Sequence, residues 1–128
     1  MQLSTTQRTA RITTLTTNIG STAKLKIYTG SAPGVANAAT GTLLSTISLP
    51  STAWTVASGV ATLSGTWQDT SAAASGTPGY WRITDSTGAT IYAEGTAGVS
   101  GGELSFTTTV SLGGTVSVTQ FTLTEGNV

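Results

Sequence analysis

The chain has 128 residues, with five basic and five acidic side chains and a formal net charge of zero. A neutral chain lacks the clustered Lys and Arg that displace counterions from phosphates, so we expect no nucleic-acid partner. Cysteine and histidine are both absent, which excludes disulfides and thiolate metal sites and removes the commonest general base and nitrogen ligand. We expect no metal, no other cofactor, and no membrane association, because no stretch approaches the length of a membrane span.

The first expected element is a helix over residues 4–19. Ser4 and Gln7 have the spacing of a capping box, in which each side chain satisfies a backbone N–H at the helix start. Gly20 suits a C-terminal stop. The apolar residues recur on one helical face: Ile12, Leu15 and Ile19. Because most of the interior is threonine, a mediocre helix former, we expect this helix to depend on packing for its stability.

After this helix the period of the apolar residues changes to two, which indicates strands. The expected strand segments, in chain order, are AKLKIYTG (23–30), TLLSTISLP (42–50), GVATLSGTW (59–67), GYWRITD (79–85), ATIYAEG (89–95), ELSFTTTV (103–110) and VSVTQFTLT (116–124). Seven or eight short strands separated by Gly and Pro turns predict a mainly β fold. We expect one antiparallel β-sandwich or jelly-roll-like domain over residues 1–128, with its strands in 23–124 and one N-terminal α-helix.

Alternation predicts which strand residues point into the core: Ala23, Leu25 and Ile27; Leu43, Ile47 and Leu49; Ala61, Leu63 and Trp67; Leu104, Phe106, Thr108 and Val110. Residues 31–41 and 69–79 are predicted loops of small residues, the second with no side chain large enough to anchor it. In the last strand the apolar phase changes between Val118 and Phe121. Either a bulge near Gln120 or burial on both faces explains that change.

The segment GYWRITDSTGATIYAEG (79–95) gathers unusual chemistry in a chain of which only 8% is charged. Residues 86–88 suit a three-residue hairpin loop after Asp85, the first turn position, with Gly88 in the left-handed conformation. The predicted pairs are Ile83 opposite Ile91, Arg82 opposite Tyr92, Trp81 opposite Ala93 and Tyr80 opposite Glu94. Trp81, Ile83, Ile91 and Ala93 then form a core face, and Tyr80, Arg82, Tyr92 and Glu94 form a face toward solvent or a partner.

That second face has two interpretations. Arg82 beside Tyr92 suits a cation–π contact, with Glu94 on the diagonal within ion-pair reach, and such cross-strand pairs decorate many exposed sheets. Tyr and Arg are also enriched at interface hot spots, so the same face is a candidate docking surface. The complete set of candidate interface residues is Tyr80, Arg82, Tyr92, Glu94 and the helix residues Arg8 and Arg11. Trp54 and Trp67 are expected in the core, or alternatively on an exposed platform that stacks a sugar ring.

The sequence gives little support for catalysis. The five carboxylates (Asp69, Asp85, Glu94, Glu103 and Glu125) are far apart in sequence and lie at strand ends or turns. A serine nucleophile needs an activating base, and only Lys24 and Lys26 are available. The glycine-rich segments lack the lysine and following helix of a phosphate-binding loop. We therefore expect no enzyme.

Four segments together resemble a group of short virion-associated structural proteins of tailed bacteriophages: LSTTQRTARITTLTTNIGSTAKLKIYTGSAPG, GTLLSTISL, GYWRITDSTGATIYAEGT and VSVTQFTLTEGN. The resemblance covers nearly the whole chain in the same order. It implies a small β-sandwich that is made in the bacterial cytoplasm and incorporated into the virion. It carries over no catalytic residues.

Three functions are compatible with these observations. The first is a capsid decoration (cement) protein that binds the major capsid protein and copies of itself, and that reinforces the shell. The second is a collar, tail or fibre-base component. The third is a carbohydrate-binding module for host attachment, which requires at least two exposed and coplanar aromatic rings.

Overall fold

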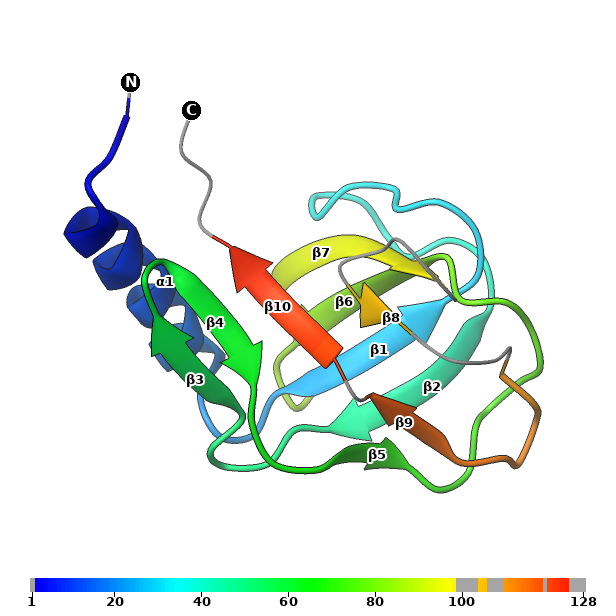
Figure 1. Ribbon diagram of the computed structural model, residues 1–128. Helices are drawn as coiled ribbons and strands as arrows, with labels where there is room; N and C mark the ends of the chain where they lie inside the picture. The colour runs from blue at the N-terminus through cyan, green and yellow to red at the C-terminus, as the bar shows by residue number, and fades with distance from the viewer. Residues whose placement is uncertain (1, 99–103, 106–109, 119, 125–128) are drawn as a thin grey trace.

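The computed structural model describes residues 2–98, 104–105, 110–118 and 120–124 (Figure 1). It is mainly β with one N-terminal helix, as predicted. The elements are α1 (Thr5–Ile19), β1 (Lys24–Tyr28), β2 (Leu43–Ser48), β3 (Trp54–Ala57), β4 (Val60–Leu63), β5 (Trp67–Asp69), β6 (Tyr80–Thr84), β7 (Ile91–Gly98), β8 (Leu104–Ser105), β9 (Val116–Val118) and β10 (Gln120–Thr124). In this described part of the chain, no helix is long and apolar enough to cross a membrane.

The helix begins and ends close to the predicted limits. The Ser4 hydroxyl accepts a hydrogen bond from the Gln7 backbone N–H at 3.2 Å, and Gly20 ends the helix with φ of 72°. Ile12 and Ile19 are buried, and Leu15 packs against the core. The helix contacts β3, β4 and β7. The predicted dependence of α1 on packing is consistent with these contacts.

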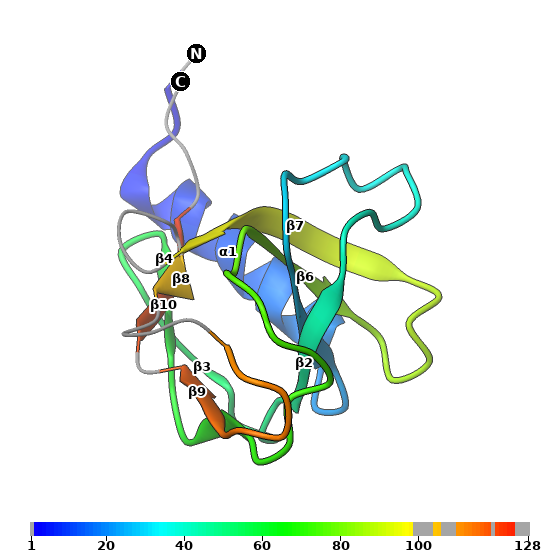
Figure 2. The same cartoon turned by 90° about the vertical axis from the view of Figure 1, so that its right-hand side faces the viewer.

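Two sheets make a sandwich-like arrangement. Eight strands form one sheet in the order β2-β1-β6-β7-β8-β10-β4-β3, and β5 pairs with β9 in a second, smaller sheet. Figure 2 shows β2, β6 and β7 on one side, β3, β4, β8, β9 and β10 on the other, and α1 behind them. The ladders are antiparallel except between β7 and β8, which run parallel. The predicted antiparallel, sandwich-like fold class is therefore confirmed, with one parallel ladder within it.

An aromatic cluster fills the space between the two sides. The Phe121 ring lies 4.8 Å from Trp81, 5.4 Å from Trp67 and 5.6 Å from Trp54, and Trp54 meets Trp67 edge to face at 4.9 Å. Edge-to-face contacts are favourable because the positive edge of one ring faces the negative face of another. Leu25, Ile27, Ile47 and Ile83 are fully buried around this cluster.

The phase change in the last predicted strand is a change of sheet. β9 ends at Val118 and pairs with β5, whereas β10 begins at Gln120 and pairs with β4 and β8. Val116, Val118, Phe121 and Leu123 are all buried because each pair points inward from its own sheet. The change therefore separates two strands that the sequence analysis treated as one.

Two other strand predictions need correction. The alternation did not predict β3, which is joined to β4 by a two-residue turn at Ser58 and Gly59 with φ of 50° and 77°. Such left-handed pairs define hairpin turns, but the usual sequence signal is Asn-Gly or Asp-Gly. In β2, Leu44 is buried and Leu43 only half-buried, because the ladder with β1 contains a bulge. The predicted core residues Phe106 and Thr108 lie outside the described residues.

The predicted loop at 69–79 is anchored, contrary to expectation. Backbone hydrogen bonds attach it: the Ala72 N–H donates to the Gly114 C=O at 2.9 Å, and the Ala73 N–H donates to the Leu44 C=O at 2.8 Å. Gly76 and Val110 exchange two backbone hydrogen bonds of 2.9 Å. The absence of large side chains did not reveal this attachment, because main-chain groups make it.

Replacing Phe121 by alanine tests the aromatic cluster. We expect the free energy of unfolding to fall by about 3–5 kcal/mol, because the substitution leaves a cavity among three tryptophans. Chemical denaturation measures the change. Leu112→Ala is the control: Leu112 is 69% exposed, so its loss should change stability by less than about 0.5 kcal/mol. Equal effects of the two substitutions would contradict the described core.

Candidate functional site

The β6–β7 hairpin keeps the predicted faces of β6 but has a different register, and the predicted core position of Ile91 is wrong: Ile91 pairs with Thr84, on the face of Arg82. Its loop is one residue longer than predicted, because the Asp85 carboxylate accepts hydrogen bonds from the backbone N–H groups of both Thr87 and Ala89. A bulge then leaves Tyr92 opposite no residue of β6. Together these changes shift the pairing by two residues. Beyond the bulge, a two-residue shift returns the side chains to their original faces, so Trp81, Ile83 and Ala93 still share one face and the two β6 residues are buried.

The corrected register places Glu94 directly opposite Arg82, where Tyr92 was expected. The Arg82 Nε atom lies 2.7 Å from Glu94 Oε2, and the two side chains are only 3% and 6% exposed. The predicted ion pair is therefore present. The predicted contact of Arg82 with Tyr92 is wrong: the guanidinium instead lies 6.0 Å from the centre of the Tyr80 ring.

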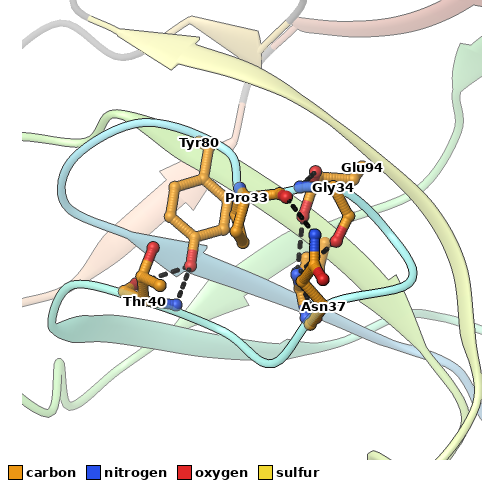
Figure 3. Close-up of polar contacts among 7 residues, drawn as sticks. Pro33, Gly34, Asn37, Thr40, Tyr80 and Glu94 are labelled. Carbon is orange, nitrogen blue, oxygen red and sulfur yellow. Dashed lines mark hydrogen bonds and ion pairs between the residues drawn. The ribbon is translucent and has the colours of Figure 1, made fainter.

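The connection between β1 and β2 (residues 29–42, here the β1–β2 loop) covers this pair. Arg82 Nη2 donates to the carbonyls of Gly34 and Asn37 at 3.0 and 2.8 Å. Glu94 Oε1 accepts a 2.8 Å hydrogen bond from the Gly34 N–H. Within the loop, the Asn37 side-chain amide donates to the Pro33 carbonyl at 2.7 Å (Figure 3). Both members of the ion pair are thus bound to the loop backbone.

Tyr80 fastens the second half of the loop. Its hydroxyl donates to the Thr40 carbonyl at 2.6 Å and accepts from the Thr40 N–H at 3.0 Å, as Figure 3 shows. The Tyr28 ring stacks on the Tyr80 ring with centroids 4.9 Å apart and planes 7° from parallel. Burial raises the pKa of the Tyr28 phenol above its usual value, Tyr80 adds to the rise and Arg82 opposes it.

Two glycines allow this close fit. A Cβ atom on Gly79 would lie 2.0 Å from the carbonyl oxygen of Gly30, and one on Gly41 would lie 2.2 Å from the carbonyl oxygen of Thr29. Gly41 also has a left-handed φ of 74°. Glycine is therefore required at Gly79, where the loop passes the residue before β6, and at Gly41, where the two ends of the loop meet.

The exposed docking face expected from the sequence is wrong for three of its four residues. Tyr80 and Arg82 are 0% and 2% exposed, and the Glu94 side chain is 6% exposed. The small residues of the β1–β2 loop indicate only a connection, and nothing in their pattern shows that they lie against the sheet. Tyr92, the fourth residue, is half-buried and packs against the core.

The two helix arginines lie elsewhere. Arg8 is half-buried on α1, where its Cβ would be 3.1 Å from a Cβ added to Gly59, and its Nη2 atom donates to Thr5 Oγ1 at 3.3 Å. Arg11 is exposed on the same helix. Figure 1 shows α1 on one side of the molecule and the β1–β2 loop on the other. The structure therefore does not bring these arginines into one patch with Arg82.

The tryptophans do not form an exposed platform. Trp67 and Trp81 are each 1% exposed. Trp54 is half-buried and meets Trp67 at 89°, so these two rings are not coplanar. Trp54 lines a groove of about 420 Å³ between the last turn of α1 and the start of β3, together with the hydroxyl side chains of Thr16, Thr17, Ser21, Ser51 and Thr52.

The two other described carboxylates, Asp69 and Asp85, are used in structural contacts. Asp69 accepts hydrogen bonds from the Ser45 hydroxyl at 2.7 Å and the Ser71 N–H at 3.0 Å. The hydrogen bond from Thr87 is the main reason that the pKa of the Asp85 carboxyl lies below its usual value. Among the described residues, no three His, Cys, Asp or Glu side chains group to hold a metal. Glu103 and Glu125 lie outside the described residues.

The β1–β2 loop presents an apolar residue that the sequence analysis did not single out. Val35 follows directly after Gly34, the residue bound to both Arg82 and Glu94, and is 54% exposed. Large apolar side chains are seldom this exposed in the described structure: the other example is Leu112. The chemistry of this site therefore suits presentation of a fixed, uncharged loop to another surface rather than proton transfer.

Comparisons with models of protein families, with curated protein sequences and with solved structures return no significant match. The function is therefore argued from the fold and the residues themselves.

Neutralising Glu94 tests whether the ion pair holds the loop. We expect Glu94→Gln to lower the free energy of unfolding by about 3–5 kcal/mol, because it leaves the buried Arg82 charge without a counter-charge. Chemical denaturation gives the change, and hydrogen exchange at Gly34 and Thr40 reports release of the loop. Lys24→Gln is the control, because it also removes one charge from a half-buried strand residue, but at a position outside the contacts of Arg82 and Glu94 with the loop. A Glu94→Gln effect no larger than this control would contradict the role of the pair.

Alkaline titration tests the burial of Tyr28. A folded-state pKa above the unfolded value of 10.0 means that Tyr28 contributes stability fully below that pH and loses it as the pH rises through the folded pKa. We expect Tyr28→Phe to remove the late-titrating component of tyrosinate absorbance and to flatten the alkaline loss of stability. The same late component in both proteins would show that Tyr28 is not its source.

Proposed function

We propose that the protein is a non-enzymatic structural protein of a tailed-phage virion, and specifically a decoration protein on the outside of the head shell. In this role it binds the major capsid protein and copies of itself through protein–protein contacts. It is made in the bacterial cytoplasm and becomes part of the particle. Its contribution is mechanical, since each bound copy ties neighbouring shell subunits together.

The observation that carries this proposal is the fixation of the β1–β2 loop. A loop of small residues loses conformational freedom wherever it is ordered, and binding is stronger when that loss occurs during folding. Here the Arg82–Glu94 pair and the Tyr80 hydroxyl fix the loop by hydrogen bonds to Gly34, Asn37 and Thr40. Val35 is then held exposed on a pre-ordered surface, which suits docking onto a rigid lattice.

The charge distribution supports the same role. The net charge is zero, and Arg82 and Glu94 are buried against each other. A surface with little charge avoids repulsion between copies that are packed closely at high density. The described carboxylates of Glu94, Asp69 and Asp85 each accept structural hydrogen bonds, which supports a role without catalysis.

A collar, tail or fibre-base protein shares this chemistry and differs in its place in the particle. Copy number distinguishes it from a decoration protein. A carbohydrate-binding module needs two exposed and coplanar rings, and Trp54 and Trp67 do not supply them. The collar, tail or fibre-base role therefore remains the alternative, and we do not propose a carbohydrate-binding role.

Counting copies in the particle tests the proposal. In virions of the phage whose genome encodes this chain, quantitative mass spectrometry should find the protein in a fixed ratio to the major capsid protein that matches the shell lattice. A copy number far below that of the shell subunits would assign the protein to the collar or tail. Absence from purified virions would contradict the structural role itself.

The loop surface is tested by two neighbouring substitutions. We expect Val35→Ser to lower the occupancy of the protein on shells that lack it, because the exposed apolar side chain is lost from the contact. Ala36→Ser is the matched control, since it places the same hydroxyl on the adjacent exposed residue. Equal occupancy of both variants would show that Val35 takes no part in docking.

A further inference from the structure

The outer edge of β3 presents backbone groups that point away from the sheet. The Ser64 N–H donates to the Ala53 carbonyl at 2.8 Å, so this pair is hydrogen-bonded across the β3–β4 ladder. Hydrogen-bonded pairs alternate with non-hydrogen-bonded pairs in an antiparallel ladder. The N–H and C=O groups of Trp54 and Val56 therefore face outward, where the described residues provide no partner strand.

The opposite edge of the same sheet is closed. At β2, the Thr46 N–H donates to Asp69 Oδ2 at 3.3 Å, and the Leu44 carbonyl accepts from the Ala73 N–H at 2.8 Å. Side-chain and loop contacts of this kind are one way in which proteins prevent strands from pairing with other chains. The two ends of the eight-stranded sheet therefore differ: β2 is covered, whereas β3, which α1 contacts, pairs with no further strand in the described part of the chain.

The β3 edge also lacks the usual protection by charge. Residues 51–68 contain no Lys, Arg, Asp or Glu. A charged side chain at an edge opposes pairing with an identical edge, because the same charge then lies across the contact. Thr55 and Ala57 are exposed and uncharged, so two copies of this strand meet without like-charge repulsion.

We propose that a second copy of this chain adds to β3 by antiparallel pairing about a two-fold axis at Thr55. In this register Trp54 of each copy faces Val56 of the other, and their outward N–H and C=O groups bond reciprocally. Thr55 faces its own equivalent as a non-hydrogen-bonded pair. The partly buried Trp54 and Val56 side chains are on the core-facing side, so the pairing extends the apolar layer of both copies.

The closed β2 edge limits what this pairing builds. Joining β3 of one copy to β2 of the next would make an open filament, and the contacts at Thr46 and Leu44 block that arrangement. A contact of β3 with β3 uses the same surface on both copies and closes as a dimer. The groove beside Trp54 leaves room along the start of the strand.

This inference deepens the proposed function and rests on it for its place in the virion, where it names the surface by which copies meet. The test uses the isolated protein, so its result is independent of the copy number in the particle. A failed dimer test leaves the virion role standing, and absence from virions leaves the dimer standing.

Single cysteines provide the test, because the chain has none of its own. In Thr55→Cys the two thiols lie on the axis, with Cα atoms about 4.5 Å apart, which is within disulfide range. In the control Ala57→Cys, on the same exposed face, the offset along the strands is about 13 Å. Under mild oxidation we expect Thr55→Cys to form the disulfide dimer at least about tenfold faster than Ala57→Cys, since pairing raises the effective thiol concentration.

Charge substitutions give an independent readout. By sedimentation equilibrium, we expect the native chain to dimerise as its concentration rises, Thr55→Lys to lose the dimer through repulsion across the axis, and Ala57→Lys to keep it. Equal cross-linking of the two cysteine variants, or a monomer at every attainable concentration, would overturn the proposal. So would cross-linking of Thr55→Cys in virions to a chain other than its own copy, which would assign the edge to a different partner.

Discussion

The buried ion pair between Arg82 and Glu94 is the interaction on which the attachment of the β1–β2 loop to the sheet depends. Burying each of the two charges costs several kilocalories per mole of desolvation free energy. The attraction between the charges alone does not always offset this cost. Here the remaining hydrogen-bonding capacity is used by the loop: Gly34 and Asn37 supply two carbonyls and one N–H. The pair is therefore satisfied only with the loop in place, and together with the Tyr80 hydroxyl it holds the loop.

This mutual dependence explains the position of β6 in the fold. All five residues of the strand are buried. Trp81 and Ile83 face the aromatic cluster, whereas Tyr80 and Arg82 face the β1–β2 loop. One strand thus joins two different environments, an apolar core built on aromatic contacts and a polar layer built on hydrogen bonds. A change on either face reaches the other through the same backbone.

The same polar groups that order the molecule also limit its chemistry. The two oxygens of the Glu94 carboxylate are bonded to Arg82 and Gly34, and the Tyr80 hydroxyl both donates to and accepts from Thr40. Such groups are structural anchors rather than acids, bases or nucleophiles. In the proposed role, the protein offers a partner two surfaces: the fixed loop with Val35 and the uncharged edge of β3.

The sequence by itself determined the local features. The capping pattern at Ser4 and Gln7 located α1, and the period of two located most strands and the core side of Trp81 and Ile83, because these signals depend on neighbouring residues. Only the tertiary structure decided the rest. Tyr80 and Arg82 alternate with apolar residues and so resemble an exposed face, but the loop from residues 29–42 covers them. The change in the phase of the apolar residues near Gln120 did not reveal a change of sheet, because packing across the whole chain decides which strands pair.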